Sequence, residues 1–283
     1  MKLTVIVPTR DRIENLPGTL EALAAQTLDH NEYEVILSDD GSRDATYRLI
    51  EQYQFKFRFK YIFSNVPKPH SWNASIPRNF AALIADHTTM AYVFVDSDVM
   101  LPPHALQCYV EDLEMNKNRV IIGPYDFYAP GNNQIQVFDV RNKKFEEATI
   151  DKIYDTVHDG LACFGGNLVI PKDIFWSVGG FDEDVHIGLE DGSMGLKLWK
   201  KGAHFSYDNR TRGKHQWHKT PEDRFPTDMK SHIDQLNLKH FHTVNPDYGI
   251  IEASREAYAS WGFPDWKPPE SWLKNQLGFM MKI

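Results

Sequence analysis

The sequence predicts an α/β protein built on a mostly parallel, Rossmann-like sheet with helices on both faces. Two observations predict this class. Short runs of β-branched and aromatic residues alternate with segments of helical periodicity over residues 3–123. Acidic residues directly follow two of the apolar runs, at 39–40 and 96–98. Because parallel strands are joined by right-handed crossovers, we expect these acidic loops along one edge of the sheet.

The expected strands are short apolar runs, several of which stop at proline or acidic residues. They cover residues 3–7, 34–38, 60–63, 91–95, 119–123 and 203–207. The expected helices carry apolar residues three and four positions apart. They cover residues 14–25, 44–54, 76–86, 103–116 and 190–201. In the helix at 76–86, Phe80, Leu83 and Ile84 are expected to face inward.

The alternation breaks over residues 125–159, a polar and aromatic stretch that we interpret as an excursion over the edge of the sheet. Structured sequence resumes at 161–170. We place the end of the main domain at residue 224 and assign residues 225–283 to a C-terminal extension. This extension is predicted to contain one helix at 228–241 and then a proline-rich end with Trp261, Trp266 and Trp272.

The composition argues against several classes of protein. The 283 residues include 31 Lys and Arg and 39 Asp and Glu, a formal net charge of −8, which argues against a sequence-independent nucleic-acid-binding protein. Cys108 and Cys163 show neither metal-site spacing nor a disulfide framework, so we expect reduced, buried thiols. No run is long and apolar enough to span a bilayer, and the start of the chain does not resemble a signal peptide. We therefore expect a cytoplasmic protein; peripheral association with a membrane and oligomerisation stay open.

The segment 91–99 is the most informative one, because an apolar strand ends in two carboxylates one residue apart, Asp96 and Asp98. Side chains alternate along a strand, so both carboxylates can point the same way. Two converging carboxylates repel each other unless a cation lies between them. A hard divalent ion with spare positions for phosphate oxygens suits that geometry. The alternative for an isolated Asp-x-Asp is a solvated pair in a turn. The other motifs of the chain decide between this alternative and a metal site.

Two further segments are candidate ligand contacts. In 39–42, helix capping explains Asp40 and Ser42, but a second acid at Asp39 leaves a carboxylate that can accept the imide N–H of a uracil. Arg78 stands at a predicted helix start, where the helix dipole disfavours a cation. A bound diphosphate would remove that conflict, whereas the alternative is a surface arginine paired with a neighbouring acid.

Acidic and imidazole side chains near the end of the α/β region complete the candidates. Glu190 and Asp191 begin a helix, where they either cap it or supply a general base that faces an acceptor hydroxyl. His215 and His218 follow the last predicted strand. Each is either a solvated or core histidine or a metal ligand shared with a distant carboxylate. Imidazole ligands shift the preference of such a site from Mg²⁺ toward Mn²⁺.

Taken together and in this order, these segments resemble a family 2 glycosyltransferase of the GT-A fold. The resemblance covers roughly residues 3–218 and rests on the segments 5–10, 39–42, 77–79, 96–98, 179–182 and 190–191. Residues 198–215 also resemble the region of polypeptide N-acetylgalactosaminyltransferases that supplies a metal-binding histidine. The spacing there favours His215, whereas related galactosyltransferases place this ligand slightly later, which leaves His218 as the alternative.

The resemblance implies transfer of a hexose or N-acetylhexosamine from a nucleotide-diphosphate sugar, with a UDP-sugar expected, to a hydroxyl of a glycan, lipid-linked or protein acceptor. It implies a nucleotide-binding half at about 1–123, an acceptor-binding half at about 124–224, and Mn²⁺ or Mg²⁺ as cofactor. The implied metal ligands are Asp98, His215, Asp96 and His218, with Asp98 the principal one. Asp191 is implied as the catalytic base, with Glu190 beside it. The implied nucleotide-sugar-binding residues are Pro8, Thr9, Arg10, Asp39, Asp40, Arg78, Asp96, Ser97 and Gly166.

The sequence also departs from the family pattern. Pro77 precedes Arg78, where many members have alanine, and the processive signature Gln-x-x-Arg-Trp is absent after Asp191, which implies single additions. The retaining relatives lack an aspartate at the position of Asp191, so an inverting transfer is expected, with retention as the alternative. A nucleotidyltransferase would carry a glycine-rich loop after the first strand, and none follows Pro8. A non-catalytic sugar-binding protein would need neither the metal residues nor the acidic pair.

Overall fold

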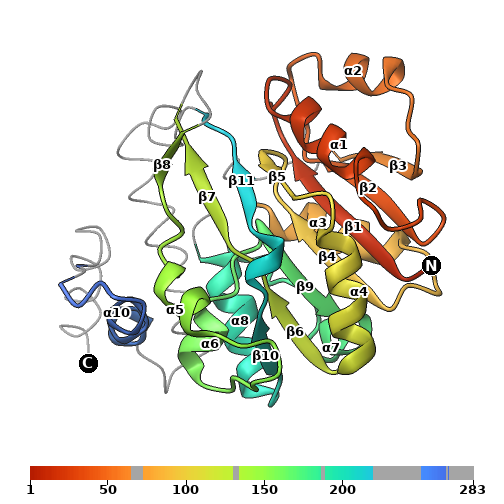
Figure 1. The fold of residues 1–283 in the computed structure, drawn as a ribbon. Coiled ribbons are helices and arrows are strands. Elements are labelled where there is room, and N and C mark those ends of the chain that lie inside the picture. Colours follow the sequence, from red (N-terminus) through yellow and green to blue (C-terminus); the bar gives the residue numbers. More distant parts are fainter. Residues whose placement is uncertain (65–72, 130–133, 186–188, 219–249, 266, 268–283) are drawn as a thin grey trace.

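A computed structural model describes residues 1–64, 73–129, 134–185, 189–218, 250–265 and 267 (Figure 1). Its centre is a seven-stranded sheet in the order β10-β6-β9-β4-β1-β2-β3. Every pairing in this sheet is parallel except those of β9, which runs antiparallel to both β4 and β6. The mostly parallel sheet expected from the sequence is therefore confirmed. The strands are β1 (Leu3–Thr9), β2 (Tyr33–Asp39), β3 (Arg58–Phe63), β4 (Ala91–Val95), β6 (Arg119–Ile122), β9 (Asn167–Pro171) and β10 (His204–Tyr207).

Helices cover both faces of this sheet, as expected. Alternating side chains of each strand separate into two apolar clusters. Val5 and Val7 of β1 pack with α1 (Leu16–Ala24) and α4 (Ala105–Met115). Ile6 packs on the other side with a cluster that includes residues of several other helices. Among those helices are α3 (Ser75–Ile84), α6 (Val157–Leu161), α7 (Lys172–Ser177) and α8 (Glu190–Lys200). A further short helix, α2 (Thr46–Gln52), precedes β3.

The acidic loops lie at one edge of the sheet because the parallel strands are in register at their carboxyl ends. Thr9 of β1 is paired with Asp39 of β2, and Ile6 is paired with Phe94 of β4. The turns that begin at Thr9, Asp39 and Asp96 therefore come together above the sheet.

A second, four-stranded sheet lies beside the first in the order β5-β11-β7-β8. Its strands are β5 (Val99–Met100), β7 (Tyr125–Tyr128), β8 (Ile135–Val137) and β11 (Gly213–His215). Residues 125–159, interpreted from the sequence as an excursion over the edge of the main sheet, supply β7, β8, α5 (Asn142–Glu147) and most of α6, and the two strands were not predicted. These strands were missed because they are two to four residues long and β7 pairs with a strand from a distant part of the chain.

A buried ion pair ties the second sheet to the main core. Arg141 is fully buried and donates from Nε (2.9 Å) and Nη2 (2.6 Å) to the carboxylate of Asp139. The same guanidinium donates to the carbonyl of Ala162 and lies 4.1 Å from the ring centroid of Phe164. Burial alone would raise the pKa of Asp139, but the charge and hydrogen bonds of Arg141 hold this pKa below its ordinary value.

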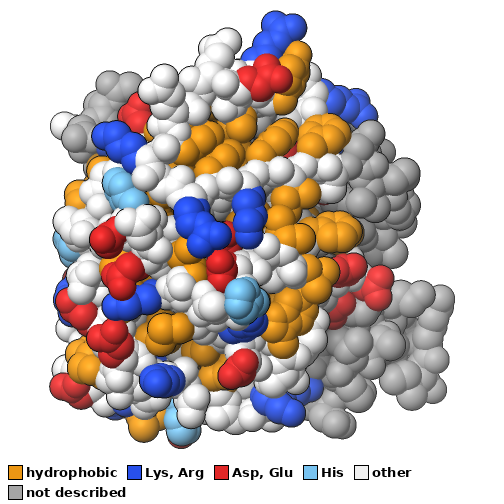
Figure 2. All heavy atoms as spheres, turned by 90° about the vertical axis from the view of Figure 1, so that its right-hand side faces the viewer, with side chains coloured by type: hydrophobic (Ala, Val, Ile, Leu, Met, Phe, Trp, Pro, Cys, Tyr) orange, Lys and Arg blue, Asp and Glu red, His pale blue; other side chains and the backbone are white. Residues whose placement is uncertain are grey.

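The α3 helix does not bury the side chains that its apolar pattern suggested. Phe80, Leu83 and Ile84 are 41%, 65% and 45% exposed, so the expectation that they face inward was wrong. The helix instead turns Arg78 and the small residue Ala81 toward the sheet. On the side of the molecule where β3 lies, groups of apolar side chains are visible among charged ones (Figure 2).

The described part of the C-terminal extension is α10 (Ile250–Ser260) and the residues after it. This helix packs against α6, and Trp261 is buried in the cluster that includes Phe164. The predicted helix at 228–241, together with Trp266 and Trp272, lies outside the described residues. Among the helices described, none has the length and apolar character needed to cross a bilayer.

We expect Arg141→Met to lower the free energy of unfolding by about 3–5 kcal/mol at neutral pH, because it leaves Asp139 buried without its counter-charge. The pKa of Asp139 is lowered in the folded state, so its stabilising contribution is present above the unfolded pKa of about 3.9 and is lost as the pH falls through the folded pKa. The difference in the free energy of unfolding between the variant and the native protein should therefore become smaller at acidic pH.

Urea unfolding at neutral pH and at about pH 3.5 measures both effects. Arg58→Met is the matched control, because Arg58 is 56% exposed in its side chain and pairs with Asp86 at 3.2 Å on the surface. Such an exposed pair is worth about 0–1 kcal/mol. Similar losses for the two variants would contradict the assignment of a structural role to Arg141.

Candidate active site

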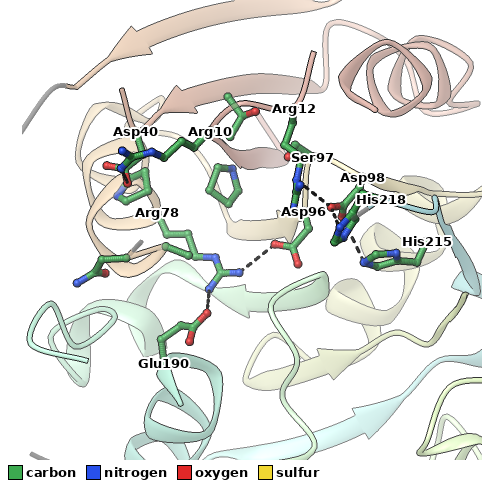
Figure 3. Close-up of a pocket in the computed structure, with 15 residues that line it drawn as sticks. Arg10, Arg12, Asp40, Arg78, Asp96, Ser97, Asp98, Glu190, His215 and His218 are labelled. Carbon is green, nitrogen blue, oxygen red and sulfur yellow. Dashed lines mark hydrogen bonds and ion pairs between the residues drawn. The ribbon is translucent and has the colours of Figure 1, made fainter. Parts of the chain in front are cut away.

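A pocket of about 230 Å³ opens at the carboxyl edge of the main sheet, next to the second sheet (Figure 3). The turns after β1 and β4 and the start of α3 form most of its wall, and β11 closes one side. Its lining residues are Pro8, Thr9, Arg10, Arg12, Asp40, Asn73, Ala74, Pro77, Arg78, Asp96, Ser97, Asp98, Glu190, His215 and His218. Most of the residues predicted from the sequence therefore lie together here.

One side of the pocket groups Asp98 with both candidate histidines. Nε2 of His215 lies 3.5 Å from Oδ1 of Asp98, and Nε2 of His218 lies 3.2 Å from Oδ2. One ligand atom from each of the three residues lies within 4.8 Å of the others. Oδ1 of Asp98 is buried and has no hydrogen-bond partner among the described residues. A carboxylate oxygen and two imidazole nitrogens are donors that suit Mn²⁺, so these residues fit a divalent metal ion.

Arg12 is a pocket residue that the sequence interpretation missed. Its Nε lies 3.4 Å from Oδ2 of Asp98, and its side chain is 11% exposed. It therefore places a positive charge next to the carboxylate of the candidate metal site. The only signal in the sequence was a second arginine two residues after Arg10 in the turn that follows β1.

The other side of the pocket is organised by Arg78, whose side chain is 2% exposed. Its Nη2 donates to Oδ1 of Asp96 at 3.0 Å, and its Nη1 donates to Oδ1 of Asp191 at 2.9 Å and lies 3.8 Å from Glu190. Its guanidinium also lies 5.0 Å from the ring centroid of Phe181. Burial alone would lower the pKa of Arg78, but the carboxylates of Asp191, Asp96 and Glu190 outweigh it and raise this pKa.

Asp96 and Asp98 have different partners, although they leave the same strand. Asp96 bonds to Arg78, whereas Asp98 faces His215 and His218 (Figure 3). Burial and the neighbouring charges of Asp98 and Asp191 raise the pKa of Asp96 above its ordinary value, despite the opposing charge of Arg78. The role of Asp96 as a further metal ligand stays a prediction.

Asp191 and Glu190 begin α8 beside the pocket. Glu190 lines the pocket, and Oδ2 of Asp191 accepts a hydrogen bond from the backbone N–H of Gly165 at 2.8 Å. Glycines at 165 and 166 permit this close approach. A Cβ on Gly165 would lie 2.5 Å from Nη2 of Arg78, and one on Gly166 would lie 3.1 Å from Oδ2 of Asp96.

The acidic pair after β2 is divided between the pocket and the core. Asp40 lines the pocket, and its Oδ2 lies 3.7 Å from Nη1 of Arg10. Asp39 is buried behind it and accepts hydrogen bonds from Tyr61 (2.8 Å) and from the backbone N–H of Ser42 (2.7 Å). Asp39 thus shapes the turn that presents Asp40, and a direct contact between Asp39 and a nucleoside stays a prediction.

Asn73 is a second pocket residue that the sequence interpretation missed. Its Oδ1 accepts from the backbone N–H of Ser75 at 2.9 Å, which satisfies an N–H group at the start of α3. Its Nδ2 donates to the carbonyl of Glu183 at 2.6 Å. The sequence signal was an asparagine just before the predicted helix, a residue type common at helix starts.

The two-sheet α/β fold thus carries, at its strand ends, a pocket that combines carboxylates, arginines and two histidines. Residues 4–177 match the model of glycosyl transferase family 2, so the chain belongs to this family. The protein is a glycosyltransferase of the GT-A fold.

Similar proteins agree with this membership. Validoxylamine A glucosyltransferase of Streptomyces hygroscopicus subsp. jinggangensis is 25% identical over 291 residues, which cover 92% of this chain and 68% of that protein. The poly(ribitol-phosphate) β-N-acetylglucosaminyltransferase TarP of Staphylococcus aureus is 34% identical over 135 residues, 47% of this chain and 39% of that protein. The crystal structure of S. aureus TarS 1–349 in complex with UDP-GlcNAc covers 97% of this chain and 79% of its own, with a TM-score of 0.68 at 18% identity.

We expect Gly165→Ala to reduce transferase activity by about 100-fold, because its Cβ would displace both Arg78 and Asp191 by a fraction of an ångström or more. Release of nucleotide from sugar-nucleotide donors measures the activity. Gly192→Ala is the matched control, since the nearest atom to its Cβ would be 3.8 Å away, in Leu161. If Gly165→Ala keeps full activity, the close packing around Arg78 is not needed for transfer.

Proposed function

We propose that this protein is a Mn²⁺-dependent, non-processive transferase that moves a sugar from a UDP-sugar to an acceptor hydroxyl with inversion at the anomeric carbon. The observation that carries the proposal is the grouping of Asp98, His215 and His218 at the pocket. Mg²⁺ is the alternative ion, but two imidazoles favour Mn²⁺. When bound, the metal ion would neutralise the charge that builds on the leaving diphosphate.

The donor class is supported by the pocket and by the similar proteins. Arg10 and Arg12 contribute positive charge to the pocket at the turn after β1, where they lie next to Asp40 and Asp98. The start of α3 also lies at the pocket wall, where Pro77 occupies its first turn. Arginines and helix starts are typical of diphosphate-binding sites. TarS has been crystallised with UDP and with UDP-GlcNAc, and we extend this donor class to the present chain.

The proposed base is Asp191, with Glu190 beside it at the pocket wall. Arg78 donates to one oxygen of the Asp191 carboxylate, and the N–H of Gly165 donates to the other. Each oxygen keeps a lone pair, and the side chain is 27% exposed, so an acceptor hydroxyl can reach it. In an inverting transfer, Asp191 takes the hydroxyl proton as the acceptor oxygen attacks the anomeric carbon.

Other parts of the proposal rest on the family and on the sequence. Membership of a glycosyltransferase family favours sugar transfer over nucleotidyl transfer and over non-catalytic sugar binding. The absence of Gln-x-x-Arg-Trp after Asp191 supports single additions rather than polymer synthesis. The acceptor class, a glycan, lipid-linked molecule or protein, and a cytoplasmic location remain part of the proposal.

We expect UDP to bind in the presence of Mn²⁺ and to lose most of its affinity when EDTA removes the metal. Asp98→Ala should abolish this metal dependence, because it removes the carboxylate that faces both histidines. His215→Ala and His218→Ala should each weaken Mn²⁺ binding by more than about tenfold. Calorimetric titration measures these affinities, and Asp173→Ala, an exposed aspartate on α7, is the control. Equal UDP affinity with and without EDTA would exclude the metal.

We expect Asp191→Asn to fold and to bind Mn²⁺ and UDP, although its amide can accept only one of the two hydrogen bonds from Arg78 and Gly165. It should lose turnover by about 10²–10⁴-fold, because the amide keeps the size of the side chain without its basicity. UDP release from UDP-glucose and UDP-GlcNAc measures turnover. Asp184→Asn, on an exposed turn, is the control. Turnover close to that of the native protein would rule out Asp191 as the base, and proton NMR that shows a retained anomeric configuration would refute single displacement.

A further inference from the structure

Gln216 lies between the two histidines of the candidate metal site and contacts three segments of the chain. Its backbone N–H donates to the carbonyl of Asp98 at 2.8 Å. Its own carbonyl oxygen lies 3.0 Å from Nδ1 of His215. Its side-chain amide donates to the carbonyl of Asn15, just before α1, at 3.0 Å. Gln216 is not itself a candidate metal ligand. It contacts the segment of Asp98, the segment of His215 and the residue that precedes α1.

The backbone contacts of Gln216 determine the tautomer of His215. A carbonyl oxygen only accepts hydrogen bonds, so Nδ1 of His215 carries the hydrogen that it shares with Gln216. In the neutral ring that a metal ion binds, Nε2 then carries the lone pair, and this atom lies 3.5 Å from Oδ1 of Asp98. A hydrogen bond from the second ring nitrogen to a backbone carbonyl is the usual way in which proteins orient a metal-binding histidine.

The side chain of Gln216 fastens this arrangement to α1. Asn15 returns a hydrogen bond from its Nδ2 to the carbonyl of Trp217 at 3.1 Å, and Asn15 is 8% exposed. The amide of Gln216 also lies 3.4 Å from Oγ1 of Thr19, whose hydroxyl donates to the carbonyl of Ser97 at 3.0 Å. The start of α1 is thus bonded to the segment of Asp98 and to the segment of the two histidines.

Gly18 makes this contact possible. Gly18 lies in the first turn of α1 and faces the amide of Gln216. A Cβ at this position would lie 2.7 Å from Oε1 and 3.1 Å from Cδ of Gln216. Those atoms are the far end of a flexible side chain, so an alanine would displace the amide of Gln216 rather than the backbone of α1.

We propose that Gly18, Asn15 and Gln216 form an α1 latch that sets the distances of His215 and His218 from Asp98. In the latch, Gln216 is a positioning residue that acts through the histidines and contacts no metal itself. This inference rests on the proposed metal site and adds to it a specific element outside the pocket lining. The latch predicts that a change on α1 alters metal affinity without a change in any ligand.

The experiment compares Mn²⁺ affinity and apo-protein stability in four variants. We expect Gln216→Ala and Gln216→Glu to weaken Mn²⁺ binding by about 10–100-fold, the range seen when support of a metal ligand is lost. The glutamate keeps the length of the side chain but cannot donate to the carbonyl of Asn15. Gly18→Ala should weaken Mn²⁺ binding by at least about tenfold, while the melting temperature of the apo protein stays the same or rises, because alanine favours a helix over glycine.

The double variant Gly18→Ala/Gln216→Ala should bind Mn²⁺ no more weakly than Gln216→Ala alone, because the side chain with which the new methyl group collides is gone. Gln107→Ala on α4 is the control, since the side chain of Gln107 bonds to Glu111 on the surface. The EPR signal of free Mn²⁺, measured with and without UDP, reports the affinities.

The outcomes separate this inference from the proposed function. If the native protein binds no Mn²⁺ in either condition, the proposed metal site itself is wrong. If the native protein binds Mn²⁺ and Gly18→Ala and both Gln216 variants bind it equally well, the metal site stands and the latch is refuted. The latch would also be refuted if the double variant lost as much Mn²⁺ affinity as Gly18→Ala and Gln216→Ala lose together, because the two residues would then act independently.

Discussion

The buried guanidinium of Arg78 is the interaction on which the rest of the site depends. A fully desolvated cation is very costly unless carboxylates surround it, and Arg78 meets three that come from the end of β4 and the start of α8. The same requirement holds in reverse, because Asp96, Glu190 and Asp191 would repel one another without this cation. This mutual need explains the orientation of α3, which turns Arg78 toward the sheet and leaves Phe80, Leu83 and Ile84 at the surface.

Around Arg78, the two carboxylates of the Asp-x-Asp segment divide the pocket into two functional sides. Asp96 belongs to the arginine cluster that also holds the proposed base, whereas Asp98 belongs to the candidate metal site. The two sides are neighbours in the sequence, because only Ser97 separates Asp96 from Asp98. Asp96 and Asp98 therefore line the same pocket while they contact different partners.

The fold was predictable where neighbouring residues carry the information. Apolar runs of five to seven residues, such as β1 and β4, produce a periodic signal that survives tertiary packing. The second sheet gave no such signal, because its strands are very short and depend on partners from elsewhere in the chain. β11 pairs with residues 99–100 on one side and with residues 125–127 on the other. Arg141 shows the same dependence, since a lone arginine in a polar stretch does not reveal that it will be buried against Asp139 and Phe164.

The sequence by itself determined the chemical types in the site and their order along the chain. Acids after strands and an arginine at a helix start predicted the pocket, because parallel strands bring their carboxyl ends to one edge. The family came from the resemblance of these ordered motifs to its pattern. Only the tertiary structure decided which groups pair with which. It separated Asp96 from Asp98, placed Asp39 behind Asp40, and brought Arg12 and Gln216 to the metal side. Those choices depend on distances between segments up to about two hundred residues apart, such as Asn15 and Gln216 at a separation of 201, and no local pattern encodes such distances.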